Sequence, residues 1–247
     1  MTHADNRSPL DGNRLLRAFE DSDRARLFEV GERVHLKQKQ VLVEPDRPYE
    51  HVYFPGDCVI SLLTVFRDDT AVETATVGCE GMLGIPVYLG TGTMPILVMN
   101  QLPGEALRVP AEEFARIAES GRTRLILDRY TQAFLSQVFQ NAACNAHHPI
   151  VERCARWLLL THDRVRSQHL ALTHELLAYM LGVRRAGVTE AAGELQAAGH
   201  IRYSRGRVEI LDRPGLESAA CECYAIMKRA YEDLLGSEAI AAGPSVH

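Results

Sequence analysis

Five arginines in the C-terminal third have the residue type and the spacing that suit contact with nucleic acid. Arg184 and Arg185 are adjacent, and Arg202, Arg205 and Arg207 follow within a short distance. A guanidinium group can pair bidentately with guanine or hold a phosphate. Residues 147–213 contain 10 Lys and Arg against 7 Asp and Glu, a balance of +3, whereas the whole chain carries −5. Local positive charge of this kind is typical of a surface that contacts phosphates.

The segment 172–210 has to position these arginines, and it predicts two short helices followed by a hairpin. Thr173 is suited to cap the first helix, and Gly182 is suited to end it. A second helix is expected from about Arg184 to Ala198. The apolar positions of the two helices recur every three or four residues: Leu176, Leu177, Met180, Leu181, Val188, Ala191, Ala192 and Leu195.

A helix, a glycine turn, a second helix and a basic hairpin follow one another along the chain. This order favours a winged helix-turn-helix. Residues 201–210 form the predicted wing, with a basic tip at 205–207. The second helix of such a unit enters the major groove, and its N-terminal residues contact base edges. We therefore expect the base-reading residues to be Arg185, Ala186, Thr189 and Glu190. The alternative is two amphipathic helices of an ordinary helical domain.

The N-terminal half predicts a different architecture, because its apolar runs are short and divided by turn residues. Strands are expected over 34–36, 40–43, 51–54, 58–66, 71–77, 96–99 and 106–109, after a helix over 13–28. Many short strands at close spacing favour a sandwich or jelly roll. The fold class is therefore α+β, with a β-rich first half and a helical second half.

One long helix should connect the two halves, since no Pro or Gly interrupts residues 122–146. Its main stripe consists of Leu127, Tyr130, Phe134, Gln137 and Asn141, and Leu125, Leu135, Val138 and Phe139 widen the apolar surface. A helix that is apolar on more than one face must bury more than one face. We expect one face to pack on the β region and the main stripe to contact a second copy, which predicts a homodimer. A core helix in a monomer is the alternative.

The composition of the chain argues against a membrane protein and against a secreted protein. No stretch approaches the ~18–20 apolar residues of a membrane span, and the N-terminus lacks the apolar region of a signal peptide. We therefore expect a cytoplasmic protein without membrane contact, whose six cysteines are reduced thiols.

The chain resembles the Crp/Fnr superfamily of bacterial transcription regulators over roughly residues 15–235. The resemblance rests on the run VERCARWLL at 151–159, on Leu172-Thr173, and on the run GVRR at 182–185. It implies a cyclic-nucleotide-binding-like β-roll sensor at 13–120, a dimerisation helix at 121–146 and a winged helix-turn-helix at 147–235. It also implies double-stranded DNA and RNA polymerase as partners, and an effector that moves the DNA-binding domain.

The resemblance also assigns roles by position. Arg185 matches the base-reading arginine of the family, whereas Ala186 and Glu190 depart from the residues of the cyclic-AMP receptor at those positions. The phosphate-contacting positions fall on Thr173, His174, Arg184, Arg205 and Arg207.

The sensor segment departs further from the family. Ile85 replaces the glutamate of the cyclic-nucleotide-binding members, and residues 81–101 contain no Lys or Arg. A buried phosphate without a cation is strongly disfavoured. We therefore expect an unknown effector other than cyclic AMP, in a pocket formed by Glu80, Gly81, Met82, Leu83, Gly84 and Met94.

No cofactor or metal is expected. The chain has no cysteine before Cys58, which argues against an N-terminal iron–sulfur cluster. His147 and His148 beside Cys144 offer metal ligands, but we interpret them as a polar hinge. Cys221 and Cys223 offer a redox pair, but we interpret them as structural residues.

These patterns together predict a dimeric, sequence-specific DNA-binding regulator without catalytic residues. A ligand-sensing adaptor that acts through protein contacts is the second hypothesis. A β-roll metalloenzyme is the third, and it is disfavoured because the β region contains only His35 and His51.

Overall fold

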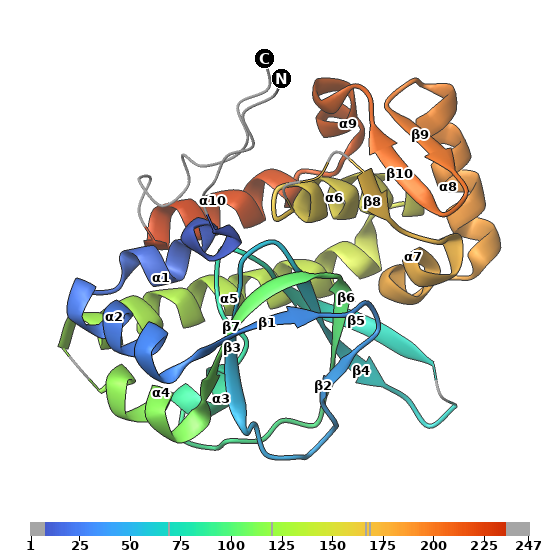
Figure 1. Ribbon diagram of the computed structural model, residues 1–247. Coiled ribbons are helices and arrows are strands. Elements are labelled where there is room, and N and C mark those ends of the chain that lie inside the picture. Colours follow the sequence, from blue (N-terminus) through green and yellow to red (C-terminus); the bar gives the residue numbers. More distant parts are fainter. Residues whose placement is uncertain (1–7, 69, 120, 166, 168, 236–247) are drawn as a thin grey trace.

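Two antiparallel sheets form the N-terminal half of the computed structural model, which describes residues 8–235 except 69, 120, 166 and 168 (Figure 1). The first sheet has the order β1 (Glu32–Leu36), β7 (Gly104–Pro110), β3 (His51–Pro55). The second has the order β2 (Val41–Val43), β6 (Leu97–Leu102), β4 (Val59–Val65), β5 (Ala71–Val77). Every predicted strand is present. The α+β class with a β-roll is therefore confirmed.

Short helices cover this β-roll: η1 (Pro9–Gly12), α1 (Arg14–Ala18), α2 (Asp21–Val30), α3 (Ile85–Tyr88) and α4 (Ala111–Ala118). The single helix predicted over 13–28 is wrong, because Phe19 and Glu20 are extended, with ψ of 158° and 144°. The break lets the Phe19 ring pack edge-on against Phe54 in the core, with 6.2 Å between the ring centroids.

The long helix α5 (Gly121–His147) lies across the β-roll, within one residue of its predicted bounds. Its main stripe faces into the chain. The five residues that we assigned to a second copy, Leu127, Tyr130, Phe134, Gln137 and Asn141, are between 0% and 7% exposed. The Tyr130 hydroxyl donates to the carbonyl of Met82, and the Gln137 amide donates to that of Thr76. That assignment therefore needs correction, because the β-roll already covers this face.

A different face of α5 remains uncovered. Leu125, Leu135 and Phe139 are 50%, 47% and 69% exposed, and Gln132 lies between them on the same side. Gln132 follows Leu125 by seven residues, Leu135 follows Gln132 by three, and Phe139 follows Leu135 by four. This spacing is that of the contact positions in a coiled coil.

The C-terminal part contains α6 (Ile150–His162), β8 (His169–Ala171), α7 (His174–Leu181), α8 (Arg185–Ala197), β9 (Ile201–Ser204), β10 (Arg207–Ile210), α9 (Arg213–Ala219) and α10 (Cys223–Leu235). Strand β8, which was not predicted from the sequence, pairs with β10 and makes the wing a three-stranded sheet. The helices α9 and α10 are separate, because Ala220 between them is extended, with ψ of 150°. In Figure 1, α10 runs alongside α5.

The C-terminal part packs directly on the β-roll. One hydrophobic cluster contains Val59 and Leu63 of β4 together with Trp157 of α6 and Met180 of α7. Buried polar contacts cross the same boundary, since the Trp157 indole donates to Glu73 at 2.9 Å. None of the helices among the described residues is both long and apolar enough to span a membrane.

Candidate nucleic-acid interface

The turn between α7 and α8 is fixed by residues that the sequence analysis identified. The Thr173 hydroxyl accepts a hydrogen bond from the backbone N–H of Leu176 at 3.1 Å, which caps α7. Gly182 ends α7 in the left-handed conformation, with φ of 62°. Arg184 is the N-cap residue of α8, and its extended backbone starts the helix one residue later than predicted.

The expected base-reading residues lie on the exposed side of α8. Arg185, Ala186, Thr189 and Glu190 occupy its first two turns and are all exposed. Positions separated by one, four and five residues share one side of a helix. The opposite side carries Val188, Ala191 and Leu195, which are at most 3% exposed. Burial of that apolar side is what orients the polar one outward.

The wing ends in a tight two-residue turn that exposes its arginines. Arg205 and Gly206 have φ of 49° and 74°, and positive values at both central residues match the right-handed twist of a hairpin. Arg205 and Arg207 are exposed at this tip, whereas Val208 is buried beneath the sheet. The wing therefore carries its charge on the outward face.

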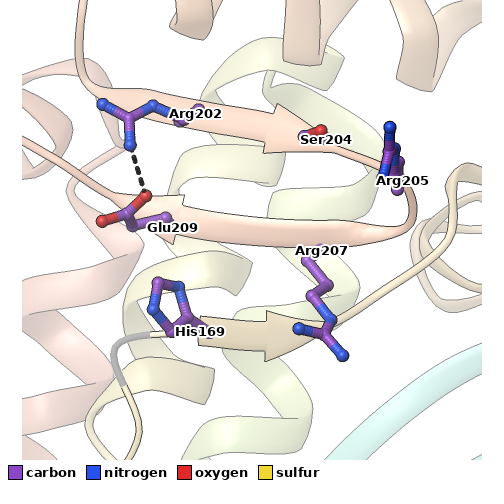
Figure 2. A pocket seen from close by; sticks show the side chains of 6 residues that line it. All are labelled: His169, Arg202, Ser204, Arg205, Arg207 and Glu209. Carbon is purple, nitrogen blue, oxygen red and sulfur yellow. Dashed lines mark hydrogen bonds and ion pairs between the residues drawn. The ribbon is translucent and has the colours of Figure 1, made fainter.

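That outward face forms an open hollow of about 520 Å³ (Figure 2). Its lining residues are His169, Arg202, Ser204, Arg205, Arg207 and Glu209. Arg202 pairs with Glu209 across the two strands, with 3.0 Å between nitrogen and oxygen. Arg205 and Arg207 lie at the other end of the hairpin from that pair (Figure 2). Two of the three wing arginines are thus left available to a ligand.

Contacts through the start of α7 join the recognition helix to the wing. The His174 Nδ1 atom lies 3.1 Å from the Thr189 hydroxyl of α8, and the ring lies against Tyr203 of β9, with 4.2 Å between the centroids. A Cβ atom on Gly206 would lie 3.3 Å from the Thr173 methyl group. The N-terminal end of α8, the N-terminal end of α7 and the wing therefore form one continuous surface, which we call the cationic surface.

The His174 side chain differs from its predicted role. Its Nδ1 atom faces Thr189, and its Nε2 atom is buried without a hydrogen-bond partner among the described residues. Burial, together with nearby Arg185, lowers the pKa of His174, which favours the neutral ring. The imidazole in this arrangement supports the surface from within. Tyr203, which holds it in place and donates to the Leu172 carbonyl at 2.6 Å, was not identified from sequence.

A second cavity, of about 220 Å³, lies between the β-roll and α5. Met82, Leu83, Gly84 and Met94 line it as expected, together with Tyr49, Phe134 and Leu135. Its full lining of 14 residues contains no Lys, Arg, Asp or Glu. The buried Tyr49 hydroxyl has no hydrogen-bond partner among the described residues.

Glu80 and Gly81 were expected in this pocket but do not line it. The Glu80 carboxylate pairs with Arg164 at 2.7 Å, and both side chains are at most 6% exposed. A Cβ atom on Gly81 would lie 2.2 Å from the Tyr130 ring, which packs against the glycine. Glu80 therefore contacts Arg164, in the loop after α6, and Gly81 contacts Tyr130 of α5. Neither residue faces the cavity.

The segment that carries the cationic surface is similar to known proteins. Residues 152–219 match the family model of the Crp-like helix-turn-helix domain. The chain is also similar to the transcriptional regulator SdrP of Thermus thermophilus, with 38% identity over 61 residues. That match spans 25% of this chain and 30% of the relative's length.

Solved structures extend the likeness to the whole fold. FixK2 of Bradyrhizobium japonicum aligns with a TM-score of 0.64 at 14% identity, over 78% of this chain and 98% of that one. A CRP/FNR-family transcriptional regulator of Thermus thermophilus aligns with a TM-score of 0.59 at 22% identity, over 76% and 98% of the two chains. At this level of identity the alignments establish the shared fold.

Proposed function

Because residues 152–219 form a Crp-like helix-turn-helix domain, on a chain with the fold of the Crp/Fnr regulators, we propose that the protein is a sequence-specific DNA-binding transcription regulator. The observation that carries the proposal is the cationic surface, in which four exposed arginines border the N-terminal end of α7. Arg185 lies near His174 at this end, and the wing turn at Gly206, flanked by Arg205 and Arg207, lies near Thr173.

Each part of this surface has its own role in the proposal. Arg185, Ala186, Thr189 and Glu190 meet base edges in the major groove. Arg184, Arg205 and Arg207 hold phosphates, as does the hydroxyl or backbone of Thr173. The phosphate-contacting role predicted for His174 falls to its backbone N–H, at the start of α7.

The salt dependence of binding to a duplex tests the proposal. The test uses a duplex that the purified protein has selected and that carries a fluorescent label. The affinity of the protein for this duplex should fall by roughly 10³–10⁵-fold between 50 and 200 mM salt if six to ten phosphates are contacted. A protein adaptor, our second hypothesis, would bind no duplex even at the lowest salt, and that result would reject DNA binding.

Dimerisation is part of the proposal, now through the uncovered face of α5. Leu125, Leu135 and Phe139 support it, because large apolar side chains this exposed on one helix gain from packing against a second copy. Two recognition helices would then meet major grooves ~34 Å apart on a near-palindromic site. The molar mass of the protein in solution tests this step.

We also infer an uncharged, mostly apolar effector for the cavity beneath α5. Its lining contains no cation to neutralise a phosphate, and one hydroxyl, that of Tyr49, is left to meet a polar atom of the ligand. Calorimetric titration with cyclic AMP should give no binding at micromolar concentrations. Submicromolar binding would contradict the inference. RNA polymerase stays a prediction from the family resemblance.

A further inference from the structure

Four potential metal ligands come together where α5 ends. Cys144 lies in the last turn of α5, and His148 follows one turn later, just after the helix. Cys221 lies between α9 and α10, and Cys223 is the first residue of α10. One ligand atom from each residue lies within 4.8 Å of the other three. The four come from segments about 75 residues apart, so only the fold unites them.

The spacing of these atoms suits a single tetrahedral ion. The Sγ atoms of Cys144 and Cys221 are 3.5 Å apart, and the Sγ atom of Cys223 is 3.6 Å from the Nδ1 atom of His148. Zinc binds sulfur at about 2.3 Å and nitrogen at about 2.0–2.1 Å, which gives ligand–ligand edges of about 3.5–3.8 Å in a tetrahedron. The two printed separations match these edges, and since all four atoms lie within 4.8 Å of one another, movements of at most about 1 Å would complete the coordination.

The neighbours of the cluster orient its ligands. The Nε2 atom of His148 lies 3.1 Å from the Glu222 carboxylate, which leaves Nδ1 directed at the sulfurs. A carboxylate that holds the far nitrogen of a histidine is the usual support of a histidine metal ligand. The Gln140 amide donates to the Cys223 sulfur at 3.0 Å, which orients that side chain.

Two buried arginine side chains near the cluster lack a carboxylate partner among the described residues. Arg153 and Arg156 are 7% and 4% exposed, and neither forms an ion pair with a carboxylate of the described residues. Their Nε atoms also have no hydrogen-bond partner among those residues. Buried charges are normally paired, and three thiolates around a divalent ion supply a net charge of −1.

We propose that Cys144, His148, Cys221 and Cys223 form a binding site for one zinc ion, which joins the end of α5 to the start of α10. Three thiols lose their protons on binding, and the imidazole binds as the neutral ring. Soft thiolate ligands with one imidazole, in a closed tetrahedral set, are typical of structural zinc. The ion also fixes the connection between α5 and α6, because His148 lies in that connection. Leu160 of α6 packs against the same cluster.

Metal analysis of the full-length protein, purified without chelators, tests the proposal. We expect one zinc per chain by mass spectrometry of the dissolved protein. After chelator treatment, Co²⁺ should bind with the intense near-ultraviolet charge-transfer bands of thiolate ligands and the visible bands of a tetrahedral ion. Zn²⁺ should then displace Co²⁺ and remove the bands.

Paired variants test which residues bind. His148→Ala should weaken Zn²⁺ binding by at least 100-fold in competition with a chromophoric chelator, whereas His147→Ala, the exposed neighbour, should leave it unchanged. Cys223→Ser should reduce the cobalt charge-transfer bands by about a third, because one of three thiolates is lost, and Cys79→Ser, outside the cluster, should leave them unchanged. Glu222→Gln should weaken binding by about 10–100-fold, since it only orients His148. Circular dichroism before metal addition establishes that each variant is folded.

Four outcomes would overturn the proposal. The first is a folded wild-type protein that takes up neither Zn²⁺ nor Co²⁺. The second is equal metal affinity in the His147 and His148 variants. The third is a disulfide between Cys144 and Cys221 in freshly purified protein, and the fourth is the absorption of an iron–sulfur cluster. None of these outcomes depends on DNA binding, so failure here would leave the proposed function untouched.

Discussion

Glu80 and Arg164 form a buried ion pair, with 2.7 Å between carboxylate and guanidinium, that joins the β-roll to the loop after α6. The same guanidinium reaches Thr76 of β5 and Gln137 of α5. A Cβ atom on Gly78 would lie 2.5 Å from the Arg164 side chain, so glycine is required where this arginine crosses. The segment that leads into the cavity beneath α5 is thus tied to the C-terminal part by a charge pair shielded from water.

Removal of the negative charge from this pair should be costly. Glu80→Gln leaves the Arg164 guanidinium buried without its counter-charge, and we expect the free energy of unfolding to fall by about 3–5 kcal/mol. Equilibrium unfolding in urea measures the change. Glu44→Gln, on an exposed turn, is the control and should stay within about 0.5 kcal/mol of wild type. A Glu80→Gln variant as stable as that control would show that the pair does not hold the domains together.

The buried carboxyl of Glu73 should make stability depend on pH. Burial raises its pKa to about 7, against the opposing hydrogen bonds from Ser61 and Trp157 and the charges of Arg164 and Arg156. Because the folded state then holds a proton that the unfolded state releases near pH 4.5, stability should decrease as pH rises from about 4.5 to 7. The contribution is on the order of 2–3 kcal/mol.

Glu73→Gln isolates this contribution, because the amide imitates the protonated carboxyl. Urea unfolding at pH 5.5 and pH 8 should show a smaller loss of stability with rising pH in this variant than in wild type. An identical pH dependence in the two proteins would rule out Glu73 as the titrating group.

Arg185 should contribute both affinity and sequence preference. Arg185→Ala should weaken binding to a selected duplex by about 1–3 kcal/mol and relax the preference at one base pair. Arg205→Ala should weaken binding to all sequences alike and reduce the salt slope by about 1. Arg229→Ala, on the exposed side of α10, is the matched control. Fluorescence anisotropy with a set of single-base variants distinguishes these results, and an unchanged preference in Arg185→Ala would refute its base-reading role.

The uncovered face of α5 should control the oligomeric state. Phe139→Glu places a charge on a side chain that is 69% exposed, so the fold should survive while association is lost. Sedimentation equilibrium should give the mass of a monomer for this variant and of a dimer for wild type. Leu211→Glu alters an exposed leucine away from α5 and should remain dimeric. Dimers in both variants would exclude this face as the contact.

Local patterns in the sequence were sufficient to predict the winged helix-turn-helix. The cap at Thr173, the glycine at 182 and the apolar positions of α7 and α8 act within a few residues of each other, so they specify the turn and the exposed side of α8 without other parts of the chain. The strands of the β-roll were predicted for the same reason, from short apolar runs divided by turn residues. The family comparison then confirmed the domain at residues 152–219.

Tertiary structure decided what depends on contacts between distant segments. Periodicity showed that α5 has two apolar faces, but only packing revealed that Tyr130 and Gln137 belong to the buried one. Glu80 is adjacent in sequence to the cavity residues, yet its charge required a buried partner, and Arg164 supplied it 84 positions later. The sequence alone led us to interpret Cys144 and its neighbouring histidines as a polar hinge and Cys221 as a structural residue. Their meeting across 77 positions is a property of the fold, because α10 returns along α5.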